Sequence, residues 1–561
     1  MEKKWTLQKS DSKIVDKLAE KLKVSKIVSH LLVLRGITTY QQAEKFFRPD
    51  INDLHDPFLM KGMKDAVDRI ELALKKGEKI LVYGDYDVDG TTSVSMMYSF
   101  LNRFSKNIGY YIPDRYDEGY GISFKGIDYA QEKECSLIIA LDCGIRAVKQ
   151  VEYASNKSID FIICDHHNPG INVPRAISIL NPKQNDCDYP YKELSGCGVG
   201  FKLIQAYSEK NNIDFTEIAE YLDLLVVSIG ADIVEITGEN RIMAYYGLKM
   251  INTSPRIGIK VLMEKSGKSG EFSISDVVFG IAPRINAAGR IEHGKRAVEI
   301  LIEEDTEKAK ILAEGIENYN LHRKELDKNI TEEALNMIDP SKKSTVVYSK
   351  DWHKGVVGIV ASRLIEKHYK PTIVLSEKDG ELTGSARSVK GFDLYNALLK
   401  CEHLLEKFGG HKYAAGLTVK KSNLNSFISE FEKVVSHLIT SDQLEPEIEV
   451  DMEIDIDEVT PKLYRILKQF APFGPKNRSP NFVSHNVQDC GYGKKVGEDK
   501  SHLRLVLNTV DDKTIISIGF GMGDYFKIIK DNQTFDVCYS IDENEWNGKK
   551  SLQLRIRDIK E

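Results

Sequence analysis

The feature that most constrains the fold is a short apolar run that ends in carboxylates and then recurs along the chain. The run KILVYG (79–84) leads into DYDVDG, where Asp85, Asp87 and Asp89 occupy alternate positions. The runs SLIIALDCG and IDFIICDHH repeat this order, and AISILNP is a fourth strand-like run. Short apolar strands that alternate with helices predict a parallel α/β sheet, in which ligands collect beyond the carboxyl ends of the strands.

Polar side chains therefore gather at one predicted sheet edge. They are Asp85, Asp87, Asp89, Asp142, Asp165, His166 and His167, together with Asp232 at the end of the apolar helix YLDLLVVSIGAD. Carboxylates this close raise each other's pKa, so a cation is expected among them. Oxygen and nitrogen ligands without cysteine suit Mn²⁺ or Mg²⁺, and the number of ligands favours two ions, as in phosphoesterases.

Any one of these residues could have an ordinary structural role. An aspartate at a strand end is often a helix N-cap or a turn residue, and Asp85 could simply bond the turn that presents its neighbours. Independent caps have no reason to recur as DxDxD, DCG, DHH and AD on successive elements. The set as a whole therefore indicates a metal centre.

A chain of 561 residues predicts three to four domains. We expect a helical extension, a first α/β domain, a charge-rich connecting helix that ends at Asp339-Pro340, a second and smaller α/β domain, and a strand-rich barrel of the OB type. The predicted boundaries are 1–75, 76–294, 295–339, 340–444 and 445–561.

Charge and cysteine usage narrow the class of protein. The net charge of −6 argues against a surface coated with basic residues, although it permits a local basic groove. The eight cysteines form no CxxC pair, so we expect reduced core thiols. No apolar stretch reaches the ~20 residues of a membrane helix, and the N-terminus has no apolar signal region. We therefore predict a cytoplasmic protein without a membrane association.

The motifs DYDVDG, LDCG, DHH and the AD of IGADIV resemble the metal motifs of the DHH phosphoesterase superfamily. RYDEGYG (115–121), APRINAAGR (282–290), GSARS (384–388) and FGGHKYAAG (408–416) resemble its RecJ branch. The resemblance implies a catalytic DHH domain, a connecting helix, a DHHA1 domain and an OB-fold. It also implies a 5′→3′ exonuclease for single-stranded DNA, with two Mn²⁺ or Mg²⁺ ions, that serves DNA repair and recombination. The implied partners are single-stranded DNA, a single-strand-binding protein and a RecQ-like helicase, and the implied state is a monomer.

The resemblance also assigns roles in the first domain. Asp87 and Asp142 would hold one metal ion. Asp142 would bridge to a second ion, whose other ligands would be Asp89, His166 and Asp232. His167 would lie near the scissile phosphate as acid, base or charge stabiliser, and we group Asp85 and Asp165 with it as catalytic residues.

The second α/β domain offers cations and hydrogen-bond donors. We expect GSARS to lie on a glycine-flanked turn, whose arginine can bind a phosphate in two-point fashion. The GGH of FGGHKYAAG supplies His411 and a glycine pair, where the backbone can approach a phosphate closely. By resemblance, Ser385, Arg387 and Arg290 would bind the 5′-terminal phosphate, while Arg115 and Tyr120 would contact the strand. The related pattern commonly reads SGRS, and this chain has Ala386 in place of that glycine.

Two alternatives stay open. One is a DHH-type phosphodiesterase for oligonucleotides or cyclic dinucleotides, although such a small substrate does not need the terminal barrel or the N-terminal extension. The other is a catalytically inactive DNA-binding scaffold, which would have no reason to keep so many mutually repelling carboxylates.

Overall fold

The computed structural model describes residues 3–378, 380–509, 514–529, 533–546 and 548–561. Contacts within the chain divide it into two compact units. The first unit contains Asp56–Asp232 and Gly247–Pro446, and the second contains Lys3–His55, Ile233–Tyr246 and Glu447–Glu561. Each unit therefore combines segments that are far apart in the sequence. The five-domain division remains a prediction.

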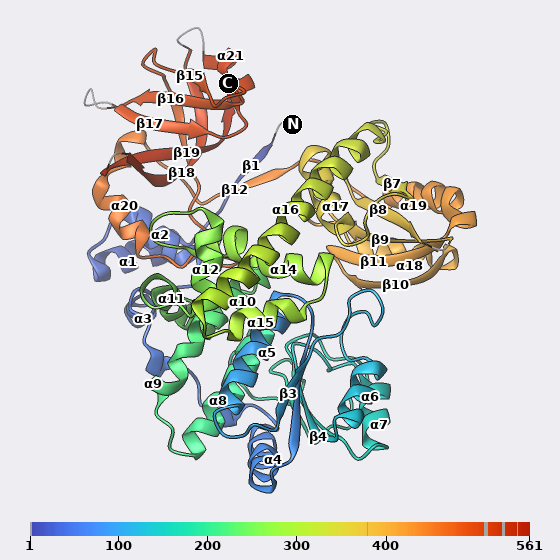
Figure 1. The fold of residues 1–561 in the computed structure, drawn as a ribbon. Coiled ribbons are helices and arrows are strands. Elements are labelled where there is room, and N and C mark those ends of the chain that lie inside the picture. The colour runs from blue at the N-terminus through green and yellow to red at the C-terminus, as the bar shows by residue number, and fades with distance from the viewer. Residues whose placement is uncertain (1–2, 379, 510–513, 530–532, 547) are drawn as a thin grey trace. The chain divides into compact units, whose positions relative to one another are not determined.

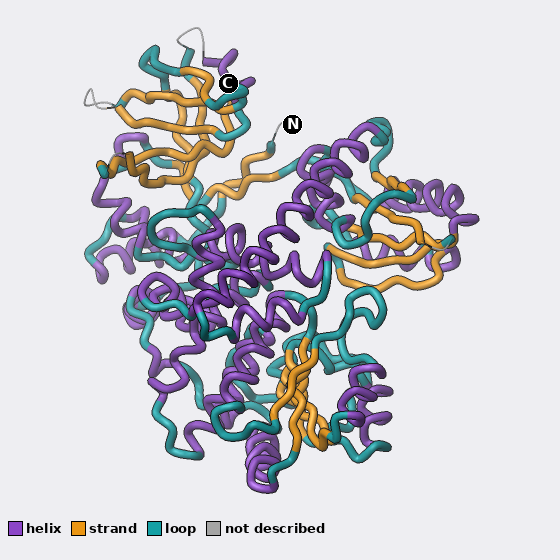
Figure 2. Tube along the Cα trace, in the orientation of Figure 1, coloured by secondary structure: helices purple, strands orange, loops and turns teal. Residues whose placement is uncertain are grey.

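The first unit contains the predicted parallel sheet (Figures 1 and 2). Its strand order is β3-β2-β4-β5-β6, and every neighbouring pair is parallel. Gly84 pairs with Leu141, and Leu141 pairs with Cys164, so β2, β4 and β5 end level with one another. This register explains why carboxylates from three strands reach one edge. The strands are β2 (Lys79–Gly84), β3 (Ile108–Tyr111), β4 (Cys135–Leu141), β5 (Asp160–Cys164) and β6 (Ser178–Leu180).

Helices cover both faces of this sheet. Apolar residues of α6 and α7 pack with Leu81, Ile138 and Phe161 into one core, and α5 and α8 lie on the other face (Figure 1). These helices, with the short ones before and between them, are η2 (Pro57–Leu59), α4 (Met63–Lys76), α5 (Val88–Leu101), α6 (Phe124–Glu132), α7 (Val148–Ser155), α8 (Gly196–Lys210), α9 (Phe215–Ile218), η3 (Ala219–Tyr221) and α10 (Leu222–Ala231).

Further helices lead from the first sheet to the next. They are α11 (Gly238–Thr253), α12 (Ile257–Ser266), α13 (Ile274–Asp276), η4 (Val277–Ile281), α14 (Ala282–Ile291), α15 (Lys295–Ile302) and α16 (Thr306–Asn336). The stretch that we predicted as one connecting helix is thus two helices. Asp305 separates them, because its side chain caps the N-terminus of α16 by accepting a hydrogen bond from Lys308 N–H.

A second five-stranded sheet follows in the same unit, with the order β10-β11-β9-β8-β7. β7 and β8 are parallel, and the remaining pairs are antiparallel. The strands are β7 (Thr345–Ser349), β8 (Thr372–Lys378), β9 (Glu381–Arg387), β10 (Leu405–His411) and β11 (Ala414–Lys420). The helices are α17 (Val357–Lys367), α18 (Leu394–Lys400), η5 (Glu402–Leu404), η6 (Lys421–Asn423), α19 (Leu424–Leu438) and η7 (Ser441–Leu444).

The expectation that Ser385 and Arg387 lie on a glycine-flanked turn was wrong, because both are strand residues. Ser385 and Arg387 belong to β9, and His411 ends β10. Strand alternation sends the methyl group of Ala386, which is fully buried, into the hydrophobic core of this domain. Because Ser385 and Arg387 point to the opposite face, Ala386 does not crowd them.

The second unit contains a seven-stranded sheet with the order β13-β14-β18-β19-β17-β16-β15, as predicted for the strand-rich terminal region. These strands are β13 (Met452–Glu453), β14 (Phe482–Val487), β15 (Lys494–Val496), β16 (His502–Asn508), β17 (Thr514–Gly519), β18 (Phe535–Trp546) and β19 (Lys549–Lys560). The helices beside them are η8 (Ile456–Glu458), α20 (Pro461–Lys468), η9 (Gly523–Tyr525) and α21 (Phe526–Ile529).

The N-terminal segment belongs to this second unit, and it is not wholly helical. β1 (Lys4–Leu7) pairs in parallel with β12 (Glu447–Val450). Leu31 and Leu32 share one core with Leu503 and Leu505 of β16. The remaining N-terminal elements are α1 (Ser12–Leu22), α2 (Lys26–Leu34), α3 (Tyr40–Phe47) and η1 (Ile51–Asp53).

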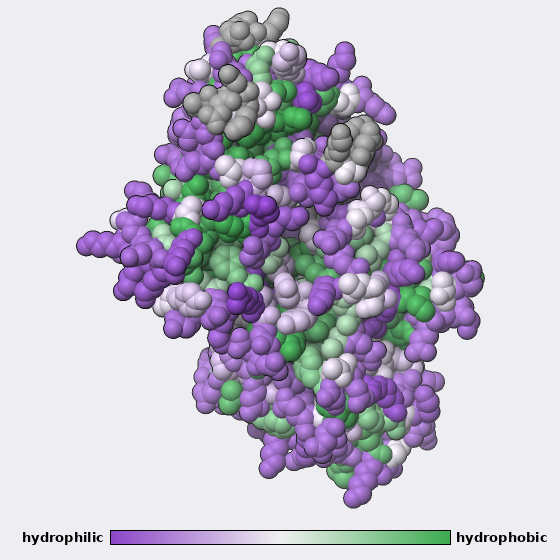
Figure 3. Space-filling model, turned by 90° about the vertical axis from the view of Figure 1, so that its left-hand side faces the viewer, coloured by the Kyte–Doolittle hydropathy of each residue, from purple (hydrophilic) through white to green (hydrophobic). Residues whose placement is uncertain are grey.

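Hydrophilic side chains cover most of the face drawn in Figure 3, and hydrophobic ones appear between them in small groups. Among the residues that the structure describes, none of the helices has both the length and the apolar character that a bilayer span requires.

Candidate metal centre and phosphate pocket

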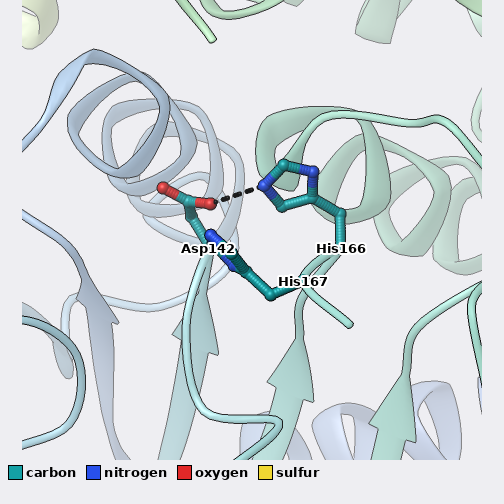
Figure 4. Close-up of side chains that lie close together, drawn as sticks. All are labelled: Asp142, His166 and His167. Carbon is teal, nitrogen blue, oxygen red and sulfur yellow. Dashed lines mark ion pairs between the residues drawn. The ribbon is translucent and has the colours of Figure 1, made fainter. Parts of the chain in front are cut away.

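The carboxyl ends of β2, β4 and β5 bring the predicted acidic cluster together. His166 Nε2 lies 3.1 Å from Asp142 Oδ1, 3.6 Å from Asp232 Oδ2 and 3.8 Å from Asp89 Oδ2 (Figure 4 draws the first pair). Among the described residues, two groups of possible ligands have atoms within 4.8 Å of one another. They are Asp142, His166 and His167, and Asp89, His166 and Asp232. His166 belongs to both groups.

Burial and mutual repulsion make this cluster unfavourable without a cation. Burial raises the pKa of Asp142 well above its usual range, and Asp89 and Asp87 raise it further. Burial and the same two neighbours raise the pKa of Asp232 to about 8. Asp142 Oδ1 and both ring nitrogens of His166 are buried without a hydrogen-bond partner. Divalent ions fit this donor set, because they would neutralise the carboxylates and use the free nitrogen and oxygen lone pairs.

The backbone of α8 holds Asp89 in place. Asp89 Oδ2 accepts a hydrogen bond from Gly196 N–H at 2.7 Å, and Oδ1 accepts one from Cys197 N–H at 2.8 Å. The hydroxyl of Ser228 also donates to Oδ1, at 2.7 Å. Position 196 must be glycine, because a Cβ there would lie 2.6 Å from Asp142 Cβ. Sequence reasoning missed these supports, although the short run SGCG was visible before a helix.

Asp87 and Asp85 have different surroundings from these ligands. Asp87 caps α5 by accepting a hydrogen bond from Gly90 N–H at 3.0 Å, and it belongs to neither of the two convergent groups. Asp85 is fully buried. Its Oδ1 accepts from Tyr86 N–H, whereas Oδ2 has no partner. Burial first, and then the charge of Asp87, raise the pKa of Asp85.

Asp165 orients His167. Its Oδ1 accepts hydrogen bonds from His166 N–H, His167 N–H and His167 Nδ1, the last at 2.7 Å. Burial opposes ionisation of this pair, but the hydrogen bond between them lowers the pKa of Asp165 to about 2 and raises the pKa of His167 to about 9. The other ring nitrogen, Nε2, lies 3.0 Å from the hydroxyl of Tyr120.

A pocket of about 240 Å³ joins this centre to basic residues. Its lining includes the carboxylates Asp87, Asp89 and Asp232 and also Arg115, Tyr120 and Arg290. The guanidinium of Arg115 stacks on the ring of Tyr86 at 4.7 Å. Asn286, which the sequence did not single out, also lines the pocket.

Arg290 lines this pocket and also contacts the loop before α17, beside the second sheet. Its Nη1 donates to Gly355 O at 2.9 Å, and its own carbonyl accepts a hydrogen bond from Tyr116. Burial lowers the pKa of Arg290 to about 10, and nearby Arg115, Arg323 and Arg387 lower it further. Mutually repelling guanidinium groups indicate a place for an anion.

Ser385 and Arg387 lie beside the first turn of α17. A Cβ at Gly358 would lie 3.0 Å from Arg387 Nη2 and 3.2 Å from Ser385 Oγ, so this glycine leaves room there. Burial lowers the pKa of Arg387. A helix N-terminus beside a hydroxyl and a guanidinium is a favourable environment for phosphate. His411 is exposed two strands from Arg387, since Arg387 pairs with Ala414 and Ala414 pairs with His411.

Comparisons with known proteins agree with this geometry. Three family models match the chain: the N-terminal domain of the DHH family at residues 79–229, the DHHA1 domain at 341–437, and the RecJ OB domain at 450–558. The single-stranded-DNA-specific exonuclease RecJ of Bacillus subtilis is 37% identical, over 99% of this chain and 70% of the relative. The Escherichia coli protein of the same name is 31% identical, over 95% of each chain.

The chain belongs to the RecJ family. A crystal structure of RecJ from Thermus thermophilus in complex with Mn²⁺ matches it with a TM-score of 0.86 at 26% identity, over 100% of this chain and 79% of that chain. The same RecJ has also been solved with Mg²⁺. The predicted family and fold class are therefore confirmed. The donor set described above fits such ions, whereas the assignment of each side chain to an ion stays a prediction.

Proposed function

We propose that the protein is a single-stranded-DNA-specific exonuclease that needs Mn²⁺ or Mg²⁺ and degrades its substrate from the 5′ end. The observation that carries the proposal is the shared pocket, in which metal-ligand carboxylates and arginines line one space. Such a pocket can hold one phosphate for cleavage while cations hold another. The names of the RecJ relatives support the substrate and the reaction.

In the first domain, Asp87, Asp89, Asp142, His166 and Asp232 would hold two ions. When bound, the metal supplies Lewis-acid charge to the phosphodiester and to the attacking water. The hydrogen bonds from α8 keep Asp89 aimed at the centre before a substrate arrives. Preorganised ligands of this kind lower the cost of reaching the transition state.

His167 would act on the substrate itself. Asp165 holds Nδ1, so Nε2 is the atom that can hold or move a proton at the phosphate. Tyr120 lies beside this atom, and its exposed ring can also stack on a base. Asp85 supports the turn that presents Asp87 and Asp89.

The 5′ end would be bound by Arg290, Ser385 and Arg387, with Arg115 on the strand. Their positions beside the N-terminus of α17 support a site for a terminal phosphate. A terminal phosphate held there would set which phosphodiester meets the metal centre. The exposed His411 is proposed as a further contact in the same row of the sheet.

The OB domain would bind the strand away from the cleaved end. Phe520 is 57% exposed, and the guanidinium of Arg555 lies 5.5 Å from its ring. His502 meets the same ring edge-on at 5.3 Å. An exposed aromatic ring beside an arginine is typical of surfaces that stack single-stranded bases.

The wider biological setting is proposed from the same resemblance. We place the activity in the cytoplasm, in DNA repair and recombination, and the eight free cysteines agree with a reducing compartment. A single-strand-binding protein and a RecQ-like helicase remain proposed partners, and the monomeric state remains a proposal.

The experiment that tests the function uses one oligonucleotide labelled at either end. With Mn²⁺ or Mg²⁺, a 5′-labelled single strand should release labelled mononucleotide at once, whereas the 3′-labelled strand should shorten gradually. The matched blunt duplex should resist. Early release of the 3′ label would overturn the polarity, and equal digestion of the duplex would overturn the strand specificity.

The two alternatives give different results in the same assay. A phosphodiesterase for dinucleotides would cleave a dinucleotide and leave the long strand intact. A scaffold would bind the labelled strand without cleaving it at any metal concentration.

A further inference from the structure

Arg241 is a buried cation that holds separate segments of the second unit together. Arg241 is only 5% exposed. The central carbon of its guanidinium lies 3.9 Å from the centre of the Phe46 ring, on which it stacks. It donates hydrogen bonds to the carbonyls of Phe46, Gln469, Phe470, Ala471 and Pro472, at 2.9–3.5 Å.

The chemistry of these carbonyls explains why a cation is buried there. Phe46 lies in the last turn of α3, Gln469 is the C-cap of α20, and residues 470–472 follow it, so the acceptors lie at or just beyond two helix C-termini. The last carbonyls of a helix lack partners within the helix and carry partial negative charge. Burial lowers the pKa of Arg241 to about 10, so it stays protonated near neutral pH. Arg241 thus fastens the start of α11 to α3 and to the segment after α20.

The same stretch of chain carries the proposed metal ligand Asp232. Asp232 is the last residue of its segment in the first unit, and Ile233 opens the segment that contains Arg241. A short turn joins α10 to α11, and in it Ile236 N–H donates to Pro475 O at 2.9 Å. Ile233 has a φ of +60°, a conformation that a β-branched residue rarely adopts and keeps only when its surroundings impose it.

α11 also packs on α10, the helix that ends at Asp232. A Cβ at Gly247 would lie 2.3 Å from Leu222 O and 2.8 Å from Val226 Cβ, so the two helices approach each other very closely there. The turn after Asp232 is therefore constrained at both ends. Helix packing fixes one side, and the hydrogen bonds of Ile236 and Arg241 fix the other.

We propose that Arg241 is a positioning residue for the metal ligand Asp232, a role that rests on the metal centre proposed above. The residue touches neither metal nor substrate. It fixes the start of α11, and the constrained turn transmits that position to Asp232. Loss of a group that orients a metal ligand typically weakens metal binding by roughly 10- to 100-fold.

The test is a Mn²⁺ titration followed by the electron paramagnetic resonance signal of free Mn²⁺, so that it does not depend on activity. Arg241→Met should weaken Mn²⁺ binding by roughly 10-fold or more. Arg284→Met is the matched control, because Arg284 is also a buried arginine that donates to main-chain carbonyls, those of Gly280 and Lys265, but it lies on α14 and not on the α10–α11 segment. It should lower the melting temperature and leave Mn²⁺ affinity within about twofold of wild type. Equal Mn²⁺ affinity in the two variants would overturn the proposal.

Two further variants keep the test decisive if Arg241→Met does not fold. Ile233→Gly loosens the turn without removing any contact of Arg241, so it should weaken Mn²⁺ binding while the melting temperature of the apo protein does not fall. Unchanged Mn²⁺ affinity in this variant would overturn the link. Asp232→Asn distinguishes the metal assignment of Asp232 from the positioning role of Arg241. If it binds Mn²⁺ like wild type, the metal assignment itself is wrong; if it binds weakly while Arg241→Met and Ile233→Gly bind normally, only the positioning role fails.

Discussion

The proposed metal centre differs in charge and in support from the proposed site for the terminal phosphate at Arg290, Ser385 and Arg387, which we call the arginine pocket. In the metal centre, burial and repulsion raise the pKa of Asp142 and Asp232, and backbone N–H groups hold Asp89. In the arginine pocket, burial and repulsion lower the pKa of Arg290. On the proposed function, the first site would hold metal ions and carry out the hydrolysis, whereas the second would bind an anion without taking part in the chemistry. The comparison predicts different effects of substitutions in the two sites. Those in the metal centre should abolish metal binding and hydrolysis, and those in the arginine pocket should weaken the use of 5′-phosphorylated ends.

The largest effect is expected from Asp142→Ala, which removes a buried carboxylate at the centre of the acidic cluster. Metal-based stabilisation of a phosphoryl transition state is worth several kcal/mol, so hydrolysis should fall by about a thousandfold or more. The measurement is the initial rate on a single strand over a range of Mn²⁺ concentrations. Substantial Mn²⁺-dependent activity in this variant would contradict the proposed role of the cluster.

Metal should also stabilise the fold, and only through the acidic site. At a free Mn²⁺ concentration of about 100 times Kd, binding to the native state adds about 2.7 kcal/mol. The melting temperature of the apo protein should therefore rise on Mn²⁺ addition, both in wild type and in Arg387→Ala. The rise should vanish in Asp87→Ala/Asp142→Ala. An equal rise in that double variant would place the ions elsewhere.

Arg387→Ala tests the arginine pocket without touching a metal ligand. Loss of one charge-assisted phosphate contact costs about 1.5–3 kcal/mol, which is roughly a 10- to 100-fold loss of kcat/KM. The loss should appear on strands with a 5′-phosphate and be much smaller on strands with a 5′-hydroxyl. Should both substrates lose activity by the same factor, Arg387 does not read the end.

The smallest effect is expected from Ser385→Ala, which removes a neutral donor beside the same guanidinium. A neutral hydrogen bond contributes about 0.5–1.5 kcal/mol, so kcat/KM on 5′-phosphorylated strands should fall roughly 2- to 12-fold. Thr383→Ala, at a neighbouring position of β9 that points to the same side, is a suitable control and should change kcat/KM little. A larger loss than in Arg387→Ala would mean that the hydroxyl, not the guanidinium, carries the site.

Much of the first site could be predicted from the sequence because its parts are local. An apolar run followed by carboxylates is enough to predict a strand and the edge at which its polar residues emerge. The supports of Asp89 could not be predicted in this way, since Gly196 and Ser228 are distant in sequence and act through a backbone N–H and a hydroxyl. Strand β3 was missed because its sequence, IGYY, has a single aliphatic residue and a glycine, which weaken the strand signal.

The second site was harder, because glycines in a motif suggest turns. GSAR is a strand here, and the pairing of β9 with β8 and β11 overrides the local tendency of glycine. Ala386 is buried because successive side chains of a strand point to opposite faces of the sheet, and a turn has no such alternation. The N-terminal helices likewise gave no sign that they would join the terminal strands in one core.

The sequence by itself determined the family, the alternation of strands and helices around the acidic cluster, and the chemical types of the proposed metal ligands, because apolar periodicity and short motifs are properties of neighbouring residues. The tertiary structure decided which distant groups meet: Asp89 with the N-terminus of α8, Arg387 with the first turn of α17, and Arg241 with the carbonyls of two helix ends. The physical reason is that each of these contacts depends on the main chain of a segment that is distant in the sequence. Every residue carries the same main-chain groups, so only the path of the folded chain selects the partners.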